Sequence, residues 1–233
     1  MFPTECFLPL PLGKKEFSMK RVRLSFIVLL FVSFPLACMT MHTVRYDIGL
    51  SAVERPENAK ERHGEQKIVA FQEEDTTKYG FEDDLIRIVW LPTPEEFVFD
   101  LTNKTNHSIK IIWDEALYVD ENGNSKRVMH SGVKYTDRNN PQPPTTVAKS
   151  ATVSDLVFPT ENVDWAGDPY GGWQIKPLFP TYSTSGTTED LLDKAKKYVG
   201  KSVQFLLPLK IEGIVNEYLF VFKVEDVVMG KTH

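Results

Sequence analysis

The chain has 233 residues and a formal net charge of −5, and 42% of its residues are hydrophobic while 25% are charged. These fractions are ordinary for a folded soluble domain. No region carries a sustained stripe of basic residues, which disfavours nucleic-acid binding. Cys6 and Cys38 are the only cysteines, so the sequence has no disulfide framework of the kind that stabilises small secreted domains.

The segment from Met19 to Cys38 has the features of a bacterial secretory signal. Three basic residues near its start precede an apolar run from Leu24 to Leu36. The run has about 13 residues, whereas a membrane-spanning helix needs about 20. We therefore assign residues 19–37 to a signal peptide and interpret residues 1–18, which lie upstream of it, as a mis-called N-terminal extension.

The end of this run, Leu36-Ala37-Cys38, resembles the lipobox of bacterial lipoproteins. The resemblance implies that Cys38 becomes the first residue of the mature protein and carries a lipid such as palmitate. Pro35 stands where that family usually has Leu or another aliphatic residue. The alternatives are ordinary cleavage with release of the protein, or an uncleaved anchor.

The same resemblance implies a location. Met39 follows the cysteine, which fits an outer-membrane lipoprotein that faces the periplasm of the bacterial cell envelope. Once the signal is removed, Cys38 is the only cysteine that remains, so no intramolecular disulfide can form.

Residues 38–66 are predicted to be a lipid-anchored tether that leads into a single β-rich domain over residues 67–233. The part up to Leu50 is mixed in character and fits either a tether or a first edge strand. Residues 51–66 are polar and charged, which is typical of a solvated linker. A short helix is the alternative for this second part.

Short apolar or alternating segments predict antiparallel strands through the middle of the chain. These segments are residues 67–72, 85–91, 97–102, 109–113, 117–119, 127–129 and 152–158. Asn122-Gly123 lies between two of them and predicts a type I′ hairpin, because both central residues of that turn need a positive φ. The related pattern of a calcium loop fails at two ligand positions, so a turn is the better interpretation.

The C-terminal region has the clearest periodicity. Thr187 to Val199 has one apolar face, acidic residues early and lysines late, which predicts a helix capped by Thr187. Residues 203–211 and 218–224 alternate around a turn and predict a hairpin, followed by a short tail. Pro208 lacks an N–H group, so its strand should be bulged or lie at an edge there.

Together these elements predict a mainly β chain. The expected fold is an antiparallel β-sandwich, of which an immunoglobulin-like sandwich is one form, with one amphipathic helix near the C-terminus. Fold-level analogy of this kind does not specify a function.

An aromatic segment rich in Gly and Pro lies between residues 162 and 185. Trp165, Tyr170, Trp173 and Tyr182 form a candidate binding surface, because Trp and Tyr on such a loop can present a rigid amphipathic patch to a peptide, glycan or protein. The alternative is that these rings pack beneath the loop and complete the core.

No motif predicts a catalytic residue, a metal site or a cofactor. The five histidines lack the spacing that would place two imidazoles on one helix face. His130, with Asp137 nearby in the sequence, is a conceivable general base, but an exposed histidine at a strand end is the simpler interpretation.

The first functional hypothesis is an envelope lipoprotein whose non-catalytic β-sandwich serves interaction or assembly. It contacts the membrane through its N-terminal lipid and binds a protein partner in the envelope. The alternative is an exported hydrolase or glycan-active enzyme built around His130, Asp137 and Trp173. A third hypothesis is a glycan-binding protein that uses Trp165, Tyr170 and Trp173. A pocket joining His130 to a carboxylate and a hydroxyl would favour the hydrolase, and a planar row of exposed rings would favour glycan binding.

Overall fold

The structure, a computed structural model, describes residues 41–232 except residues 75, 168–170 and 185–187. Residues 39–233 form one compact unit. The predicted extension, signal peptide and Cys38 lie outside the described residues. Helices are few in the described part: α1 (Ala59–His63), α2 (Glu189–Lys196) and 3-10 turns at Trp113–Glu115, Tyr135–Asp137 and Thr160–Asn162.

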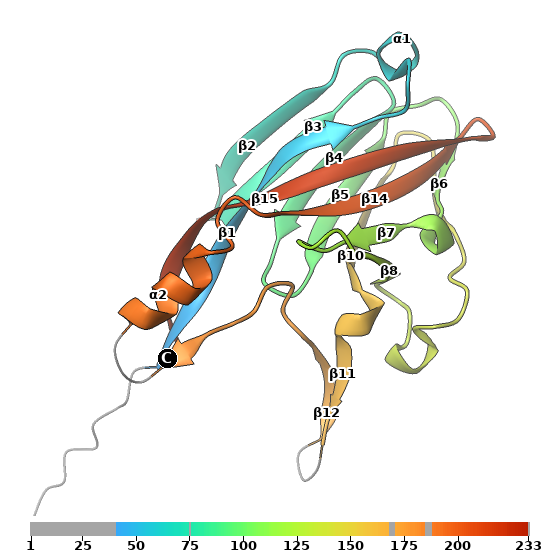
Figure 1. The fold of residues 1–233 in the computed structure, drawn as a ribbon. Helices are drawn as coiled ribbons and strands as arrows, with labels where there is room; N and C mark the ends of the chain where they lie inside the picture. The colour runs from blue at the N-terminus through green and yellow to red at the C-terminus, as the bar shows by residue number, and fades with distance from the viewer. Residues whose placement is uncertain (1–40, 75, 168–170, 185–187, 233) are drawn as a thin grey trace, which may run out of the picture. The chain divides into compact units, whose positions relative to one another are not determined.

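Antiparallel strands make up most of the described chain (Figure 1). They are β1 (Met41–Glu54), β2 (Lys67–Glu73), β3 (Thr76–Glu82), β4 (Ile86–Pro92), β5 (Phe97–Asn103), β6 (Ile109–Ile111), β7 (Leu117–Val119), β8 (Ser125–His130), β9 (Thr145–Val147), β10 (Thr152–Pro159), β11 (Val163–Ala166), β12 (Gly172–Ile175), β13 (Ser183–Thr184), β14 (Ser202–Ile211) and β15 (Ile214–Thr232). Hydrogen bonds join them in the order β13-β1-β15-β14-β7-β8-β10-β5-β4-β3-β2, with β6 beside β14 and β9 beside β6. The strands β11 and β12 form a separate two-stranded hairpin.

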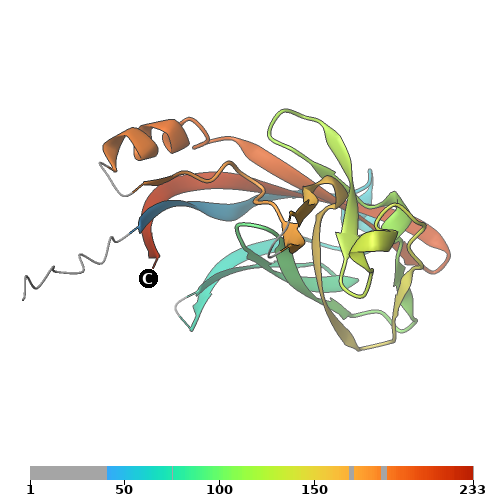
Figure 2. The ribbon, with the colours of Figure 1, turned by 90° about the horizontal axis from the view of Figure 1, so that it is seen from below.

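This sheet curls so that two layers face each other across one core (Figure 2). Trp90 of β4 lies at the centre of that core and is fully buried. The centroid of its ring is 4.9 Å from that of Phe99 in its own layer. It is 5.0 Å from Phe220 and 5.5 Å from Phe222 in the facing layer. Interdigitated rings on the inner faces are the packing expected of a sandwich, so the predicted antiparallel β-sandwich is confirmed.

Residues 41–54 form β1, so the segment up to Leu50 is the strand that the sequence left open beside a tether. The strand continues to Glu54, into the residues expected to be a solvated linker. This strand pairs with β15 along its length, and β13 covers only His42 and Thr43 on its other side. Pairing with β1 also extends β15 to Thr232, through the residues predicted to be a short tail. The short helix considered for the charged stretch exists as α1, which follows a turn at Pro56.

The predicted amphipathic helix near the C-terminus is confirmed as α2. Leu191 and Ala195 are buried where the helix packs on β1 and β15. The side chain of Thr188, the residue before the helix, makes no capping hydrogen bond. The predicted cap Thr187 lies outside the described residues. Gly200 ends the segment with φ +85°, a conformation that glycine adopts without strain.

The predictions for Pro208 and for the Asn122-Gly123 turn have different outcomes. Strand β14 pairs with β7 up to Leu206 and with β6 from Leu209. Pro208 lies at this change of partner, so no hydrogen bond of the ladder is missing on that side. The type I′ turn at Asn122-Gly123 is wrong, since only Gly123 has a positive φ. The carboxylate of Asp120 accepts bonds from the amides of Asn122 and Asn124, each at 2.9 Å, and stabilises a longer loop instead.

Within the residues that the structure describes, no helix has the length and apolar character needed to cross a membrane.

Candidate functional site

The aromatic pair Trp165 and Trp173 lies on the β11–β12 hairpin. The two residues are cross-strand partners, and their ring centroids are 5.4 Å apart at an interplanar angle of 77°. Trp165 is 52% exposed and Trp173 is 37% exposed, so these rings do not complete the core. Figure 1 shows that the hairpin extends away from the sheet that surrounds the core. Large exposed rings on a projecting element are typical of contact surfaces.

A shallow hollow adjoins this pair. Its volume is about 380 Å³, and its lining comes from Trp173 and the segment of residues 133–136. Tyr135 packs against Trp173 with ring centroids 5.9 Å apart, and the Arg138 guanidinium lies 5.3 Å from the centroid of the Trp173 ring. The arrangement presents two indole rings, a phenol and one cation at a single surface. We call this set, Trp165, Trp173, Tyr135 and Arg138, the aromatic hairpin surface.

The other two residues of the predicted surface are not shown beside it. Tyr170 lies outside the described residues. Tyr182 lies beside the start of β1, where its carbonyl oxygen accepts a hydrogen bond of 3.0 Å from the amide of Val44, and its side chain packs on the main core. The structure therefore joins Trp165 to Trp173 and places Tyr182 at a different part of the molecule.

His130 meets a carboxylate, but from Asp155 and not from Asp137. Its Nδ1 lies 3.1 Å from Oδ2 of Asp155, and its ring stacks on Trp113 with centroids 4.1 Å apart. The side chain is 11% exposed, so the expectation of an exposed strand-end histidine is wrong. Its Nε2 is buried and has no hydrogen-bond partner in the described part of the chain.

Among the described residues this pair lacks the third member of a nucleophilic triad, because no hydroxyl there is bonded to Nε2 of His130. Burial opposes the charge on Asp155, but hydrogen bonds from His130, Ser131 and the amide of Leu156 outweigh it and lower the pKa of the carboxyl. The carboxylate is thus held by three neighbours and orients the imidazole against Trp113.

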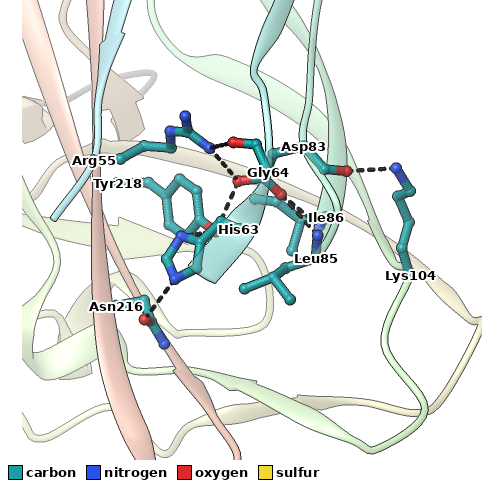
Figure 3. A network of polar contacts seen from close by, with 9 residues as sticks. All are labelled: Arg55, His63, Gly64, Asp83, Leu85, Ile86, Lys104, Asn216 and Tyr218. Carbon is teal, nitrogen blue, oxygen red and sulfur yellow. Dashed lines mark hydrogen bonds and ion pairs between the residues drawn. The ribbon is translucent and has the colours of Figure 1, made fainter. Parts of the chain in front are cut away.

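A second polar cluster closes the end of the sandwich that carries α1 (Figure 3). Asp83, in the turn between β3 and β4, is its centre, and its side chain is completely buried. Its Oδ1 accepts hydrogen bonds from the amides of Leu85 and Ile86 at 2.9 and 3.0 Å. Its Oδ2 accepts from the Tyr218 hydroxyl at 3.1 Å and pairs with Arg55 at 3.3 Å. We call the side chains of Asp83, Arg55, Tyr218, His63 and Asn216 the buried polar cluster.

His63 joins the cluster from the C-terminal end of α1 and is 1% exposed. Its Nε2 lies 3.1 Å from Oδ1 of Asn216, and its Nδ1 lies 3.4 Å from the Tyr218 oxygen. Burial lowers the pKa of His63, although the charge of Asp83 opposes this effect. Burial, together with Asp83, strongly raises the pKa of Tyr218, so this hydroxyl stays protonated and donates to the carboxylate.

Sequence reasoning did not find this cluster. An acidic run such as Glu82-Asp83-Asp84 is typical of a solvated face, but only Asp84 is exposed, whereas Asp83 is buried. One local signal was present: an Asp two or three residues before apolar strand residues can accept their backbone amides. The side-chain partners of Asp83, Arg55 and Tyr218, are 28 and 135 residues away from it in the chain, so no local pattern could have predicted them.

In the described residues no group of three or more His, Cys, Asp or Glu side chains is placed to hold a metal ion.

No protein-family model matches the chain, no curated protein is significantly similar to it in sequence, and no solved structure significantly matches its fold.

Proposed function

We propose that this chain is a lipid-anchored protein of the bacterial cell envelope whose β-sandwich serves as a non-catalytic interaction module. The exposed Trp165–Trp173 pair carries the proposal, because two large rings held by a short hairpin can bury much apolar area with little loss of side-chain entropy. A protein partner fits this surface best. Arg138 and Tyr135 add the cation and hydroxyl that are common at protein contacts.

The geometry of the rings favours a protein over a glycan. Sugar platforms are flat, whereas these two indoles are 77° from coplanar. An edge-to-face pair instead presents a ridge beside the hollow lined by Lys134 and Thr136, which suits insertion of an apolar side chain from a partner. The His130–Asp155 pair gives less support to a hydrolase, because its Nε2 meets no hydroxyl among the described residues.

The anchor in this proposal is a lipid on Cys38. Strand β1 begins at Met41, only three residues later. Three extended residues span about 10 Å, so a lipid on Cys38 would hold the sandwich close to the bilayer. The partner would then be a membrane protein or another component near the membrane surface.

Metabolic labelling with radioactive palmitate tests the anchor. We expect label in the wild-type protein and none in Cys38→Ser. An unlabelled wild-type protein would contradict the lipid anchor while leaving the interaction surface untouched.

Site-specific photo-crosslinking in living cells tests the surface. A photoreactive residue at position 165 should give a defined adduct, and the substitution Trp173→Ala should abolish it. The control is the same residue at position 199, where Val199 is 43% exposed but lies beyond α2. Equal adducts at both positions, or none at position 165, would contradict the proposed contact surface.

A further inference from the structure

A cleft of about 610 Å³ lies between the two layers, at the end of the sandwich opposite α1. Its walls come from β1 at residues 45–48, from β3 around Tyr79, and from the turn of residues 91–94, with Ala70 and Glu225 at its sides. Figure 2 shows the layers diverging toward this end. The volume is within the range of about 300–1,000 Å³ that is typical of binding sites.

Two unpaired strand edges border this cleft. In the described chain β2 pairs only with β3, and β13 covers only His42 and Thr43 of β1, so β1 is unpaired on that side beyond Val44. Strand β2 is one end of the hydrogen-bonded path, and β1 is next to its other end, β13; β1 and β2 contact each other without pairing. An unpaired edge presents a row of N–H and C=O groups to any extended chain that approaches it.

Glu225 supplies the charge of the cleft. The pairing of β1 with β15 passes from Asp47↔Asp226 to Ile48↔Val224, which leaves Glu225 as the extra residue of a bulge. Bulges re-aim side chains and are common beside binding sites. The carboxylate of Asp47 forms an ion pair with Arg45 at 3.4 Å, whereas the side chain of Glu225 has no hydrogen-bond or ion-pair partner among the described residues.

The carboxylate of Glu225 lies against Gly49 and near Tyr79. A Cβ atom on Gly49 would lie 2.3 Å from Oε1 of Glu225, so the carboxylate rests where glycine leaves room. Burial raises the pKa of the Tyr79 hydroxyl, and the charges of Glu225 and Asp47 raise it further. The cleft thus combines an unpaired carboxylate, a protonated phenol and a free strand edge.

We propose that this cleft binds an extended peptide segment of a partner protein, which adds to the free edge of β2 and places a Lys or Arg side chain against Glu225. Strand addition supplies affinity through main-chain hydrogen bonds, and the charged contact supplies specificity. The β2 edge offers seven residues for such pairing, which a small amine could not use. This inference does not depend on the lipid anchor or on the aromatic hairpin surface.

Selection from a random heptapeptide phage library on residues 39–233, which form one compact unit, tests this inference. Phage that bind the variant Glu225→Lys, in which an exposed residue is substituted, are first removed from the library. We expect enriched sequences that share one Lys or Arg among β-branched residues. No enrichment over the depleted library, or enriched sequences without a cation, would overturn the proposal.

Synthetic versions of an enriched peptide separate the two contacts. Glu225→Gln should weaken binding about 5- to 10-fold, since a charge-assisted bond becomes a neutral one. Glu217→Gln, an exposed control on the same strand outside the cleft, should leave the affinity unchanged. Two further peptides carry N-methyl groups on alternate backbone amides, one on the odd-numbered and one on the even-numbered amides. The peptide whose methylated amides face the β2 edge should not bind. Full affinity in Glu225→Gln, or for both alternately N-methylated peptides, would contradict the proposed mode.

Gly49→Ala provides a variant that keeps the charge. The added methyl group must displace the flexible end of Glu225, and Gly49 does not need a positive φ, so the fold should tolerate it. We expect weaker peptide binding with an unchanged melting temperature. Unchanged binding in this variant would show that the position of the carboxylate is irrelevant.

Discussion

The two ends of the sandwich differ in the burial and the pairing of a carboxylate. At the end that carries α1, Asp83 is completely buried and has four partners, including Arg55 and Tyr218 (Figure 3). At the other end Glu225 is exposed in a cleft and has none among the described residues. A buried charge is tolerated only when it is paired and hydrogen-bonded. We therefore expect the first end to contribute stability and the second to be available for binding.

Neutralising Asp83 should have the largest effect on stability. Asp83→Asn leaves Arg55 without its ion-pair partner. If the amide oxygen keeps the two backbone bonds, the NH2 group faces the Arg55 guanidinium and the Tyr218 hydroxyl, where Oδ2 accepted before. Loss of one member of a buried pair destabilises by about 3–5 kcal/mol. Urea denaturation measures the change, and Asp84→Asn is the matched control, because the neighbouring Asp84 is exposed. A loss below about 1 kcal/mol, which is ordinary for a point mutation, would mean that this end is not closed by its polar cluster.

Removing one hydroxyl from the buried polar cluster should lower the free energy of unfolding by less than Asp83→Asn does. Tyr218→Phe keeps the buried ring but removes the donor that lies 3.1 Å from Oδ2 of Asp83. A hydrogen bond to a charged group contributes about 1.5–3 kcal/mol. Tyr79→Phe at the cleft is the matched control, since the Tyr79 hydroxyl has no hydrogen-bond partner in the described residues. Equal losses in the two variants would remove the distinction between the ends.

His63 should make the closed end sensitive to acid. Burial lowers its pKa below the ordinary value of 6.5, so the unfolded chain binds the proton more tightly than the folded chain does. Stability should then rise with pH through the window below about 6.5, by at most about 1.4 kcal/mol per pH unit for a single proton. Urea denaturation at pH 5.5 and 7.5 measures the slope.

The matched variant for this slope is His63→Gln, which has no titrating group. We expect a smaller loss on acidification than in the wild type, while the contributions of all other groups cancel in the difference. Identical slopes would show that His63 is not the group that carries the acid sensitivity.

The sequence predicted the sandwich where alternation was regular, as in β5 and in the β14–β15 hairpin. For the segment up to Leu50 it left a tether and a first edge strand open. An extra residue of β1 between Leu50 and Ala52 breaks the two-residue period, so that the next buried position after Leu50 is Val53. The rings of Trp165 and Trp173 were identified as a candidate surface from their composition and local turn residues. The buried polar cluster was not, because His63 and Asn216 are 153 residues apart and no local pattern pairs them.

At the end of the sandwich with the cleft, Glu225→Gln should change stability least of all these variants. It is the direct counterpart of Asp83→Asn. Glu225→Gln makes the same chemical change, but its carboxylate has no partner to lose in the described structure and lies near Asp47 and Asp226 along the bulged strands. Urea denaturation should therefore show a change within about 0.5 kcal/mol, as is usual for surface sites. Relief of like-charge repulsion makes a small gain the favoured sign. A loss comparable with that of Asp83→Asn would mean that Glu225 stabilises the sandwich, and its carboxylate would then not be free to bind a cationic side chain.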